Sequence, residues 1–139
     1  MVRIIIAGGR DFTDYEFLTL SVDSVLTELS IKNMSVGLGD SPAGVLHGVE
    51  FISGTARGAD VLGENFAASR CWKVARFPAN WDAYGKSAGY IRNEQMAKYA
   101  ISDNSYGVLI AFWDGKSKGT KHMIDLAKKY DLDVFIFNY

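Results

Sequence analysis

The sequence predicts an α/β protein with a single Rossmann-like domain, in which helices cover both faces of a mostly parallel five-stranded sheet. Two observations lead to this class. Short apolar runs alternate five times with segments whose apolar residues have helical spacing, and this alternation is typical of a parallel sheet with helical crossovers. Glycine-rich loops with Arg, Lys or hydroxyl residues follow the apolar runs, as expected where strands end at a binding edge.

The five predicted strands are short and rich in β-branched and aromatic residues. The first is almost continuously apolar, which is how a strand buried on both faces reads. Glycines, prolines or polar residues follow the strands and end them. We expect the strands at residues 2–7, 50–52, 73–77, 107–112 and 133–137.

Four helices are predicted between these strands. The first begins after Thr13 or Asp14, either of which is a suitable N-cap. The second opens at Gly58 or Asp60. The third and fourth are expected over residues 87–100 and 121–130.

One segment departs from the alternation. Residues 33–48 carry several glycines and Pro42, and the segment is longer than an ordinary helix-to-strand connection. It lies at the sheet edge opposite the glycine-rich loops. We interpret it as a surface insertion within one domain that spans residues 1–139.

Composition narrows the class of protein. A length of 139 residues with 48% apolar residues indicates one folded domain with its own core. A net charge of −1 argues against bulk nucleic-acid binding. The single cysteine, Cys71, excludes an internal disulfide and is expected to be a packed thiol. No signal-peptide pattern and no apolar run of ~20 residues is present, so we expect a cytoplasmic protein without a membrane partner.

The glycine-rich loops predict a site for phosphate or sugar oxygens. Right-handed crossovers place every strand-to-helix loop at one edge of the sheet, where glycine lets a ligand approach the backbone and helix N-termini attract anions. The loops are residues 8–11, 53–60, 85–89 and 114–120. Together with the helix that follows the third loop, they supply the candidate ligand-binding residues Gly8, Gly9, Arg10, Gly54, Thr55, Arg57, Gly58, Lys86, Ser87, Arg92, Asn93, Gly115, Ser117, Gly119 and Thr120.

These loops carry a family resemblance that runs through the chain in order. Residues 8–12, 54–60, 78–81, 85–96 and 114–120 resemble YspA-like members of the SLOG superfamily. This Rossmann-like group includes the Lonely Guy enzymes and the DNA-processing protein A family. The resemblance implies a nucleotide or nucleotide-derived ligand. It also implies a homo-oligomer, because related proteins complete their pockets with a neighbour's residues.

The chain departs from the Lonely Guy signature at the position that matters for catalysis. Those enzymes release the base from a nucleoside monophosphate and have an Arg-Lys-x-x-Met helix and a Gly-Thr-x-x-Glu loop. Here Arg92 to Met96 resembles the first, with Asn93 in place of Lys, and Met123 replaces the Glu of the second. Glycosidic cleavage needs a carboxylate near the oxocarbenium-like centre. Asn80 also replaces an expected Asp.

Several side chains have two readings. Arg92 is either a bidentate phosphate ligand or a surface arginine paired with Glu94 or Asp103. His122, next to Met123, is either structural or an acid–base group. Trp81, Tyr84 and Trp113 are either stacking platforms for a base or lid packing. The candidate catalytic residues are Arg92, Asp60, Glu64 and Asp114.

Three functions remain open. We favour a binding module that senses, carries or sequesters a nucleotide-derived small molecule. The alternative is an N-glycosidase (phosphoribohydrolase) that uses a different carboxylate. A weaker alternative is single-stranded DNA binding. No metal and no cofactor is expected.

Overall fold

The protein forms one parallel sheet in the strand order β3-β2-β1-β4-β5. The structure is a computed structural model that describes residues 1–36 and 48–139, with side chains described for 1–30 and 48–139. The predicted five-stranded α/β fold is confirmed, and every strand pair is parallel. The strands are β1 (Val2–Gly8), β2 (Val49–Ser53), β3 (Lys73–Arg76), β4 (Tyr106–Trp113) and β5 (Asp133–Asn138).

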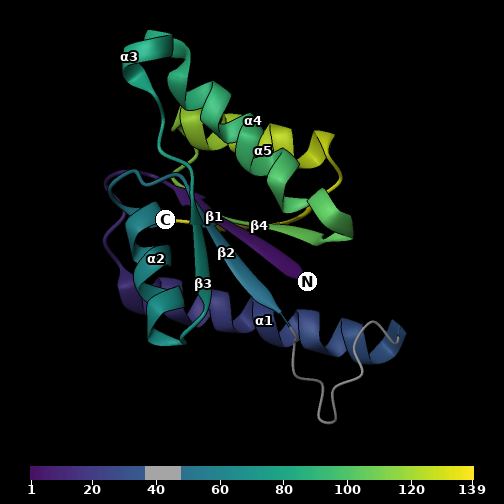
Figure 1. The fold of residues 1–139 in the computed structure, drawn as a ribbon. Coiled ribbons are helices and arrows are strands. Elements are labelled where there is room, and N and C mark those ends of the chain that lie inside the picture. Colours follow the sequence, from purple (N-terminus) through teal and green to yellow (C-terminus); the bar gives the residue numbers. More distant parts are fainter. Residues whose placement is uncertain (37–47) are drawn as a thin grey trace.

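Helices cover both faces of this sheet. Figure 1 shows α1 (Tyr15–Val36) and α2 (Ala59–Ser69) on one side, and α4 (Ala88–Ala100) and α5 (Lys118–Lys129) on the other. Three short helical turns complete the described elements: α3 (Trp81–Tyr84), η1 (Gly85–Ser87) and η2 (Ser102–Asn104). The alternation of strand and helix therefore produces two helical layers around one sheet.

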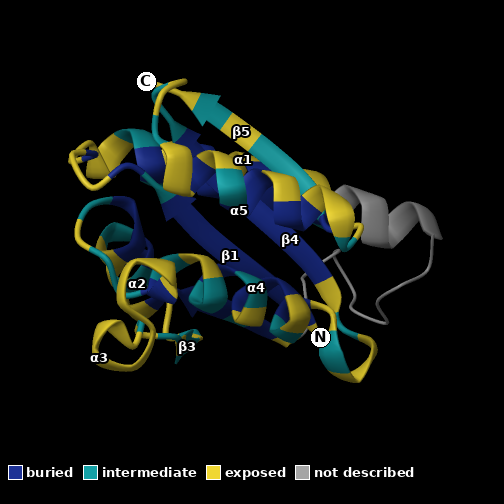
Figure 2. Ribbon diagram, turned by 90° about the horizontal axis from the view of Figure 1, so that it is seen from above, coloured by how far each residue is buried: buried dark blue, intermediate teal, exposed yellow. Residues whose placement is uncertain are grey.

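The two central strands, β1 and β4, are buried on both faces, which explains why their sequences are almost continuously apolar. Alternate side chains of β1 enter different cores: Ile4 and Ile6 pack with α1 and α2, whereas Ile5 packs with α4 and α5. A strand that contributes to both cores has no solvent face. Figure 2 shows β1 and β4 buried along most of their length, while the edge strand β5 is intermediate or exposed.

The strand order creates a crevice between the ends of β1 and β4. The chain moves outward from β1 to β2 and β3, then returns to β4 on the other side of β1 and continues to β5. Such a reversal leaves the loops after the two central strands on opposite helical layers, which is where open α/β sheets bind ligands. Among the described residues, no helix is both long enough and apolar enough to cross a lipid bilayer.

Local capping follows the sequence in two places. The Asp14 carboxylate accepts a hydrogen bond from the Phe17 N–H at 3.0 Å at the start of α1. The Ser117 hydroxyl accepts one from the Thr120 N–H at 3.4 Å at the start of α5. Because Ser117 caps the helix, α5 begins three residues earlier than we predicted, at Lys118.

Two expectations change in the structure. The packed thiol predicted for Cys71 is wrong, because Cys71 is exposed. It occupies the left-handed turn after α2 (φ 58°), which the chain makes at the surface. The predicted insertion at 33–48 begins inside α1, which continues to Val36. The remainder of that segment, residues 37–47, lies outside the described residues.

Candidate functional site

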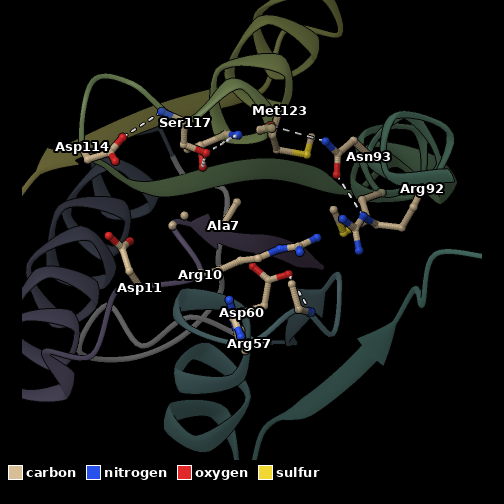
Figure 3. A pocket seen from close by; sticks show the side chains of 16 residues that line it. Ala7, Arg10, Asp11, Arg57, Asp60, Arg92, Asn93, Asp114, Ser117 and Met123 are labelled. Carbon is tan, nitrogen blue, oxygen red and sulfur yellow. Dashed lines mark hydrogen bonds between the residues drawn. The ribbon is translucent and has the colours of Figure 1, made fainter. Parts of the chain in front are cut away.

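A cavity of about 490 Å³ opens at the carboxyl ends of β1 and β4 (Figure 3). Loops from both helical layers surround it, so segments far apart in the sequence meet there. The predicted ligand-binding residues that line it are Gly8, Gly9, Arg10, Arg57, Arg92, Asn93, Ser117, Gly119 and Thr120. Two of the predicted carboxylates, Asp60 and Asp114, also line it.

Three arginines from three elements share this cavity. Arg10 follows β1, Arg57 lies in the loop before α2, and Arg92 lies on α4 (Figure 3). Arg10 and Arg57 are exposed, and neither guanidinium donates a hydrogen bond to any described residue. These two cations are therefore available to a ligand.

Arg92 is held by the protein and faces the cavity. Its Nη1 donates to the Gly54 carbonyl, and its Nε donates to Asn93 Oδ1 at 3.0 Å. The alternative pairing with surface carboxylates does not occur: Glu94 accepts a hydrogen bond from Tyr130, and Asp103 lies 3.6 Å from Arg3. These two contacts orient Arg92, and no described residue accepts a hydrogen bond from its Nη2.

Two positively charged side chains of the cavity, Arg10 and Arg92, lie close enough to affect each other. Burial lowers the pKa of Arg92, the nearby Asp60 carboxylate opposes this shift, and the charge of Arg10 adds to the lowering. Two guanidiniums that repel each other in a half-buried setting are stabilised when an anion joins them. The arrangement favours a phosphate or similar anion between Arg10 and Arg92.

Asp60 has the most perturbed carboxyl of the cavity. It is 7% exposed, and burial raises its pKa to about 6, against a hydrogen bond from the Ala56 N–H and the charge of Arg92. The Ala56 N–H lies 3.2 Å from Asp60 Oδ2. A carboxyl that titrates near neutral pH is suited to proton transfer.

The other two carboxylates of the cavity are engaged within the protein. Asp114 Oδ1 accepts hydrogen bonds from the backbone N–H groups of Lys116 and Ser117, each at 2.8 Å, and these bonds lower its pKa. Asp11 Oδ1 accepts a hydrogen bond from the Tyr139 hydroxyl at 2.6 Å. The Asp114 contacts therefore occupy two backbone N–H groups of this loop.

Two glycines bring the loops together instead of lining this cavity. Gly58 has φ +84°, and a Cβ there would lie 2.3 Å from the Gly9 carbonyl oxygen. A Cβ on Gly54 would lie 2.8 Å from both Arg92 Nη1 and Asp60 Oδ2. Side chains at these positions would therefore separate the first two loops and displace the Arg92 and Asp60 pair.

Smaller hollows adjoin the main cavity along the two arginines. One of about 380 Å³ is lined by Gly54 and Thr55, and one of about 210 Å³ by Lys86. Arg10, Arg92 and Trp81 line both. Trp81 is 51% exposed, so its ring is open to a stacking partner.

The remaining predicted residues lie away from the cavity walls. Glu64 accepts hydrogen bonds from the Ser53 hydroxyl at 2.6 Å and from Arg76 Nε at 2.8 Å, and it joins the ends of β2 and β3. Ser87 and Gly115 are exposed and line neither the main cavity nor the two hollows beside it.

Met123 occupies the position where a Lonely Guy enzyme has its glutamate. It is 1% exposed and forms an apolar wall of the cavity together with Met96 and Ala7. The side chains of Met123, Met96 and Ala7 carry no acidic or basic group. Among the described side chains, no group of three or more His, Cys, Asp or Glu residues is arranged to hold a metal ion.

Sequence reasoning missed one contact that organises the site. Asn93 Nδ2 lies 3.1 Å from His122 Nδ1, although 29 residues separate them in the sequence. Neither residue type signals this pairing, because it depends on how α4 packs against α5. Asp11 was also missed as a cavity residue, although it directly follows Arg10 in the first loop.

Comparisons with known proteins agree with this architecture. The chain is 29% identical to the Gene 61 protein of Mycobacterium phage D29 over an alignment of 146 residues. The alignment covers 99% of this chain and 97% of the phage protein. No solved structure matches the chain. The sequence model of the YspA, cpYpsA-related SLOG family matches residues 2–84, from β1 to α3. The protein with this arginine-lined cavity therefore belongs to the YspA, cpYpsA-related SLOG family.

Proposed function

We propose that this protein binds a phosphorylated, nucleotide-derived small molecule in the cavity lined by Arg10, Arg57 and Arg92. The observation that carries the proposal is that two of these guanidiniums have no hydrogen-bond acceptor among the described residues, at the sheet edge where such folds bind ligands. Arginine forms paired hydrogen bonds to phosphate oxygens. Membership of a SLOG family supports a ligand of the nucleotide class.

The size and lining of the cavity fit such a molecule. A volume of about 490 Å³ lies within the ordinary range of small-molecule sites, about 300–1,000 Å³. The polar wall of arginines suits the phosphate end. The apolar lining of Met96, Met123 and Ala7 suits the flat, less polar part of a nucleoside. We place the phosphate near Arg10 and Arg92 and the nucleoside toward the methionines.

Asp60 supports a second candidate function, hydrolysis of an N-glycosidic bond. Its carboxyl lines the same cavity and has a pKa raised to about 6, so it changes protonation near neutral pH. In this alternative, Asp60 takes the part that the missing glutamate plays in Lonely Guy enzymes, and Arg92 holds the phosphate. Met123 favours the binding function, because it leaves an apolar wall at the catalytic position.

One experiment separates the two functions. The protein is incubated with a mixed pool of nucleoside monophosphates, cyclic nucleotides and ADP-ribose, and the bound and free fractions are analysed by mass spectrometry. Retention of an unchanged ligand supports the binding function. Release of free base with ribose phosphate, lost in Asp60→Asn, supports hydrolysis. If neither retention nor base release occurs, both proposals are wrong.

A further inference from the structure

We propose that His122, which lies outside the cavity, positions Arg92 through the side-chain amide of Asn93, and that protonation of His122 weakens ligand binding. The inference rests on the proposed binding function and adds a positioning residue and a pH dependence to it. His122 does not line the main cavity; it lies in a separate groove with Tyr90 and residues of α5.

A chain of hydrogen bonds connects His122 to Arg92. Asn93 is 7% exposed, and its Oδ1 accepts a hydrogen bond from Arg92 Nε at 3.0 Å (Figure 3). Its Nδ2 lies 3.1 Å from His122 Nδ1 and 3.5 Å from the Gly119 carbonyl oxygen. The amide therefore faces a donor on one side and acceptors on the other.

This pattern determines the orientation of the amide and the state of the imidazole. Asn93 Nδ2 is a donor, so His122 Nδ1 must accept with its lone pair, and the neutral ring carries its proton on Nε2. The reverse amide orientation would direct an NH₂ group at Arg92 Nε, where two donors would meet. Only neutral His122 in the Nε2–H form satisfies every group of the chain.

Protonation of His122 breaks this pattern. Both ring nitrogens of the imidazolium are donors, so Nδ1–H would oppose the Asn93 amide. The ring cannot move freely, because Tyr90 packs against it in an edge-to-face contact with 4.4 Å between ring centroids. Asn93 must then turn or withdraw, and Arg92 loses one of the two contacts that orient it.

The charges around His122 determine its protonation state. Burial lowers the pKa of His122 and outweighs the opposing charges of Asp125 and Glu94, so the ring is neutral at neutral pH. Lys118 and Lys121 line the same groove. Both carboxylates have other partners: Asp125 pairs with Lys121 at 2.9 Å, and Glu94 accepts a hydrogen bond from the Tyr130 hydroxyl and lies 3.5 Å from Lys98.

The sign of the pH effect distinguishes positioning from simple electrostatics. A positive charge on His122 would by itself attract an anionic ligand and strengthen binding. Loss of Arg92 positioning would weaken binding instead. We expect the positioning effect to dominate, because His122 lies in a separate groove and does not line the main cavity.

The test compares wild-type protein with His122→Gln, using ADP-ribose as the probe. Its diphosphate keeps a constant charge in this pH range. Gln accepts a hydrogen bond from Asn93 but does not titrate. We expect the ratio of the wild-type Kd to the variant Kd to rise about three- to tenfold from about pH 7.5 to a pH that protonates His122, which corresponds to one lost hydrogen bond. Asp60 titrates in both proteins, so it cancels from this ratio. A ratio that stays constant or falls would overturn the inference.

A second readout needs no ligand. Nitrogen-15 NMR of the histidine side chains at about pH 7.5 should show His122 as the Nε2–H tautomer. The chain has two histidines, and His122→Gln distinguishes the signals of His122 from those of His47. An Nδ1–H tautomer would overturn the inference. If ADP-ribose binds neither protein, the binding proposal fails for that ligand, while the tautomer still decides whether His122 and Asn93 are paired.

Discussion

Two arginines at opposite ends of β1 have contrasting surroundings. Arg3, at the amino end, is 8% exposed, and its guanidinium donates hydrogen bonds to other parts of the protein. Its Nε lies 3.1 Å from Glu50 Oε1, and its Nη1 donates to the Tyr99 carbonyl at 3.0 Å and to the Ser102 hydroxyl at 2.6 Å. Arg10, just beyond the carboxyl end, is exposed and donates no hydrogen bond to any part of the chain that the structure describes.

The difference matches the proposed function, in which Arg3 stabilises the fold and Arg10 binds a ligand. A buried charge is tolerated only when it is paired and hydrogen-bonded, and Arg3 meets that condition by joining β1 to β2 and to the end of α4. Arg10 shares its cavity with two more guanidiniums, and its charge disfavours the charged form of Arg92. An anion would relieve this repulsion, so under the proposed function one edge of the sheet stabilises the fold and the other binds the ligand.

The largest effect is expected at the stabilising edge. Arg3→Met leaves the Glu50 carboxylate, 16% exposed, without its cationic partner, and removes the Arg3 hydrogen bonds to the Tyr99 and Ser102 carbonyls. Removing one member of such a buried pair costs about 3–5 kcal/mol. Urea denaturation would measure this loss in the free energy of unfolding. A loss below about 1 kcal/mol would show that Arg3 does not hold this edge together.

At the binding edge the same kind of substitution should spare stability and reduce affinity. Arg10→Ala removes a charged hydrogen-bond donor worth about 1.5–3 kcal/mol to an anion, so the Kd for the retained ligand should rise roughly 10- to 100-fold. Isothermal titration would measure it. The matched control is Arg70→Ala, another surface arginine, whose partner Asp23 lies 2.9 Å away. If both variants bind equally, the cavity is not where the ligand sits.

A smaller effect should appear in the pH dependence of stability. The pKa of Asp60 is about 6 in the folded protein and 3.8 as the unperturbed value, so stability is greatest while Asp60 is neutral and falls as the pH rises through 6. This shift corresponds to at most about 3 kcal/mol. Because Asn does not ionise, and because the pKa of Asp60 already includes its attraction to Arg92, we expect Asp60→Asn to stabilise the ligand-free protein by up to about 3 kcal/mol at pH 7.5.

Thermal and urea unfolding of wild-type protein and Asp60→Asn across about pH 4–8 would measure this gain. The gain should vanish toward pH 4, where both side chains are neutral. A variant that is less stable than wild type at pH 7.5 would contradict the account, since it would show that the Asp60 charge stabilises the fold.

Much of the fold was predictable because it depends on local patterns. The apolar run of β1 identifies a buried strand, and Asp14 identifies the start of α1, without any knowledge of distant contacts. The shared edge of the loops follows from the handedness of the crossovers. These rules place Arg10, Arg57 and Arg92 near one another before any coordinates exist.

The finer features depend on packing between distant segments. Glu64 was a candidate for the cavity, but its carboxylate bonds to Ser53 and Arg76, and only the approach of β3 explains that direction. The contact between Asn93 and His122 arises where α4 meets α5. Cys71 was expected to be packed but occupies a left-handed surface turn. The periodicity of the sequence does not predict these contacts between distant segments.

The central claim is that the arginine-lined cavity binds a nucleotide-derived anion. The most direct measurement is equilibrium dialysis of a mixed nucleotide pool against wild-type protein and the double variant Arg10→Ala/Arg57→Ala, with mass spectrometry of the retained molecules. We predict that wild-type protein retains a phosphorylated nucleotide derivative and that the double variant, folded to the same extent by circular dichroism, loses it. Equal retention by the two proteins, or none by either, would contradict the claim.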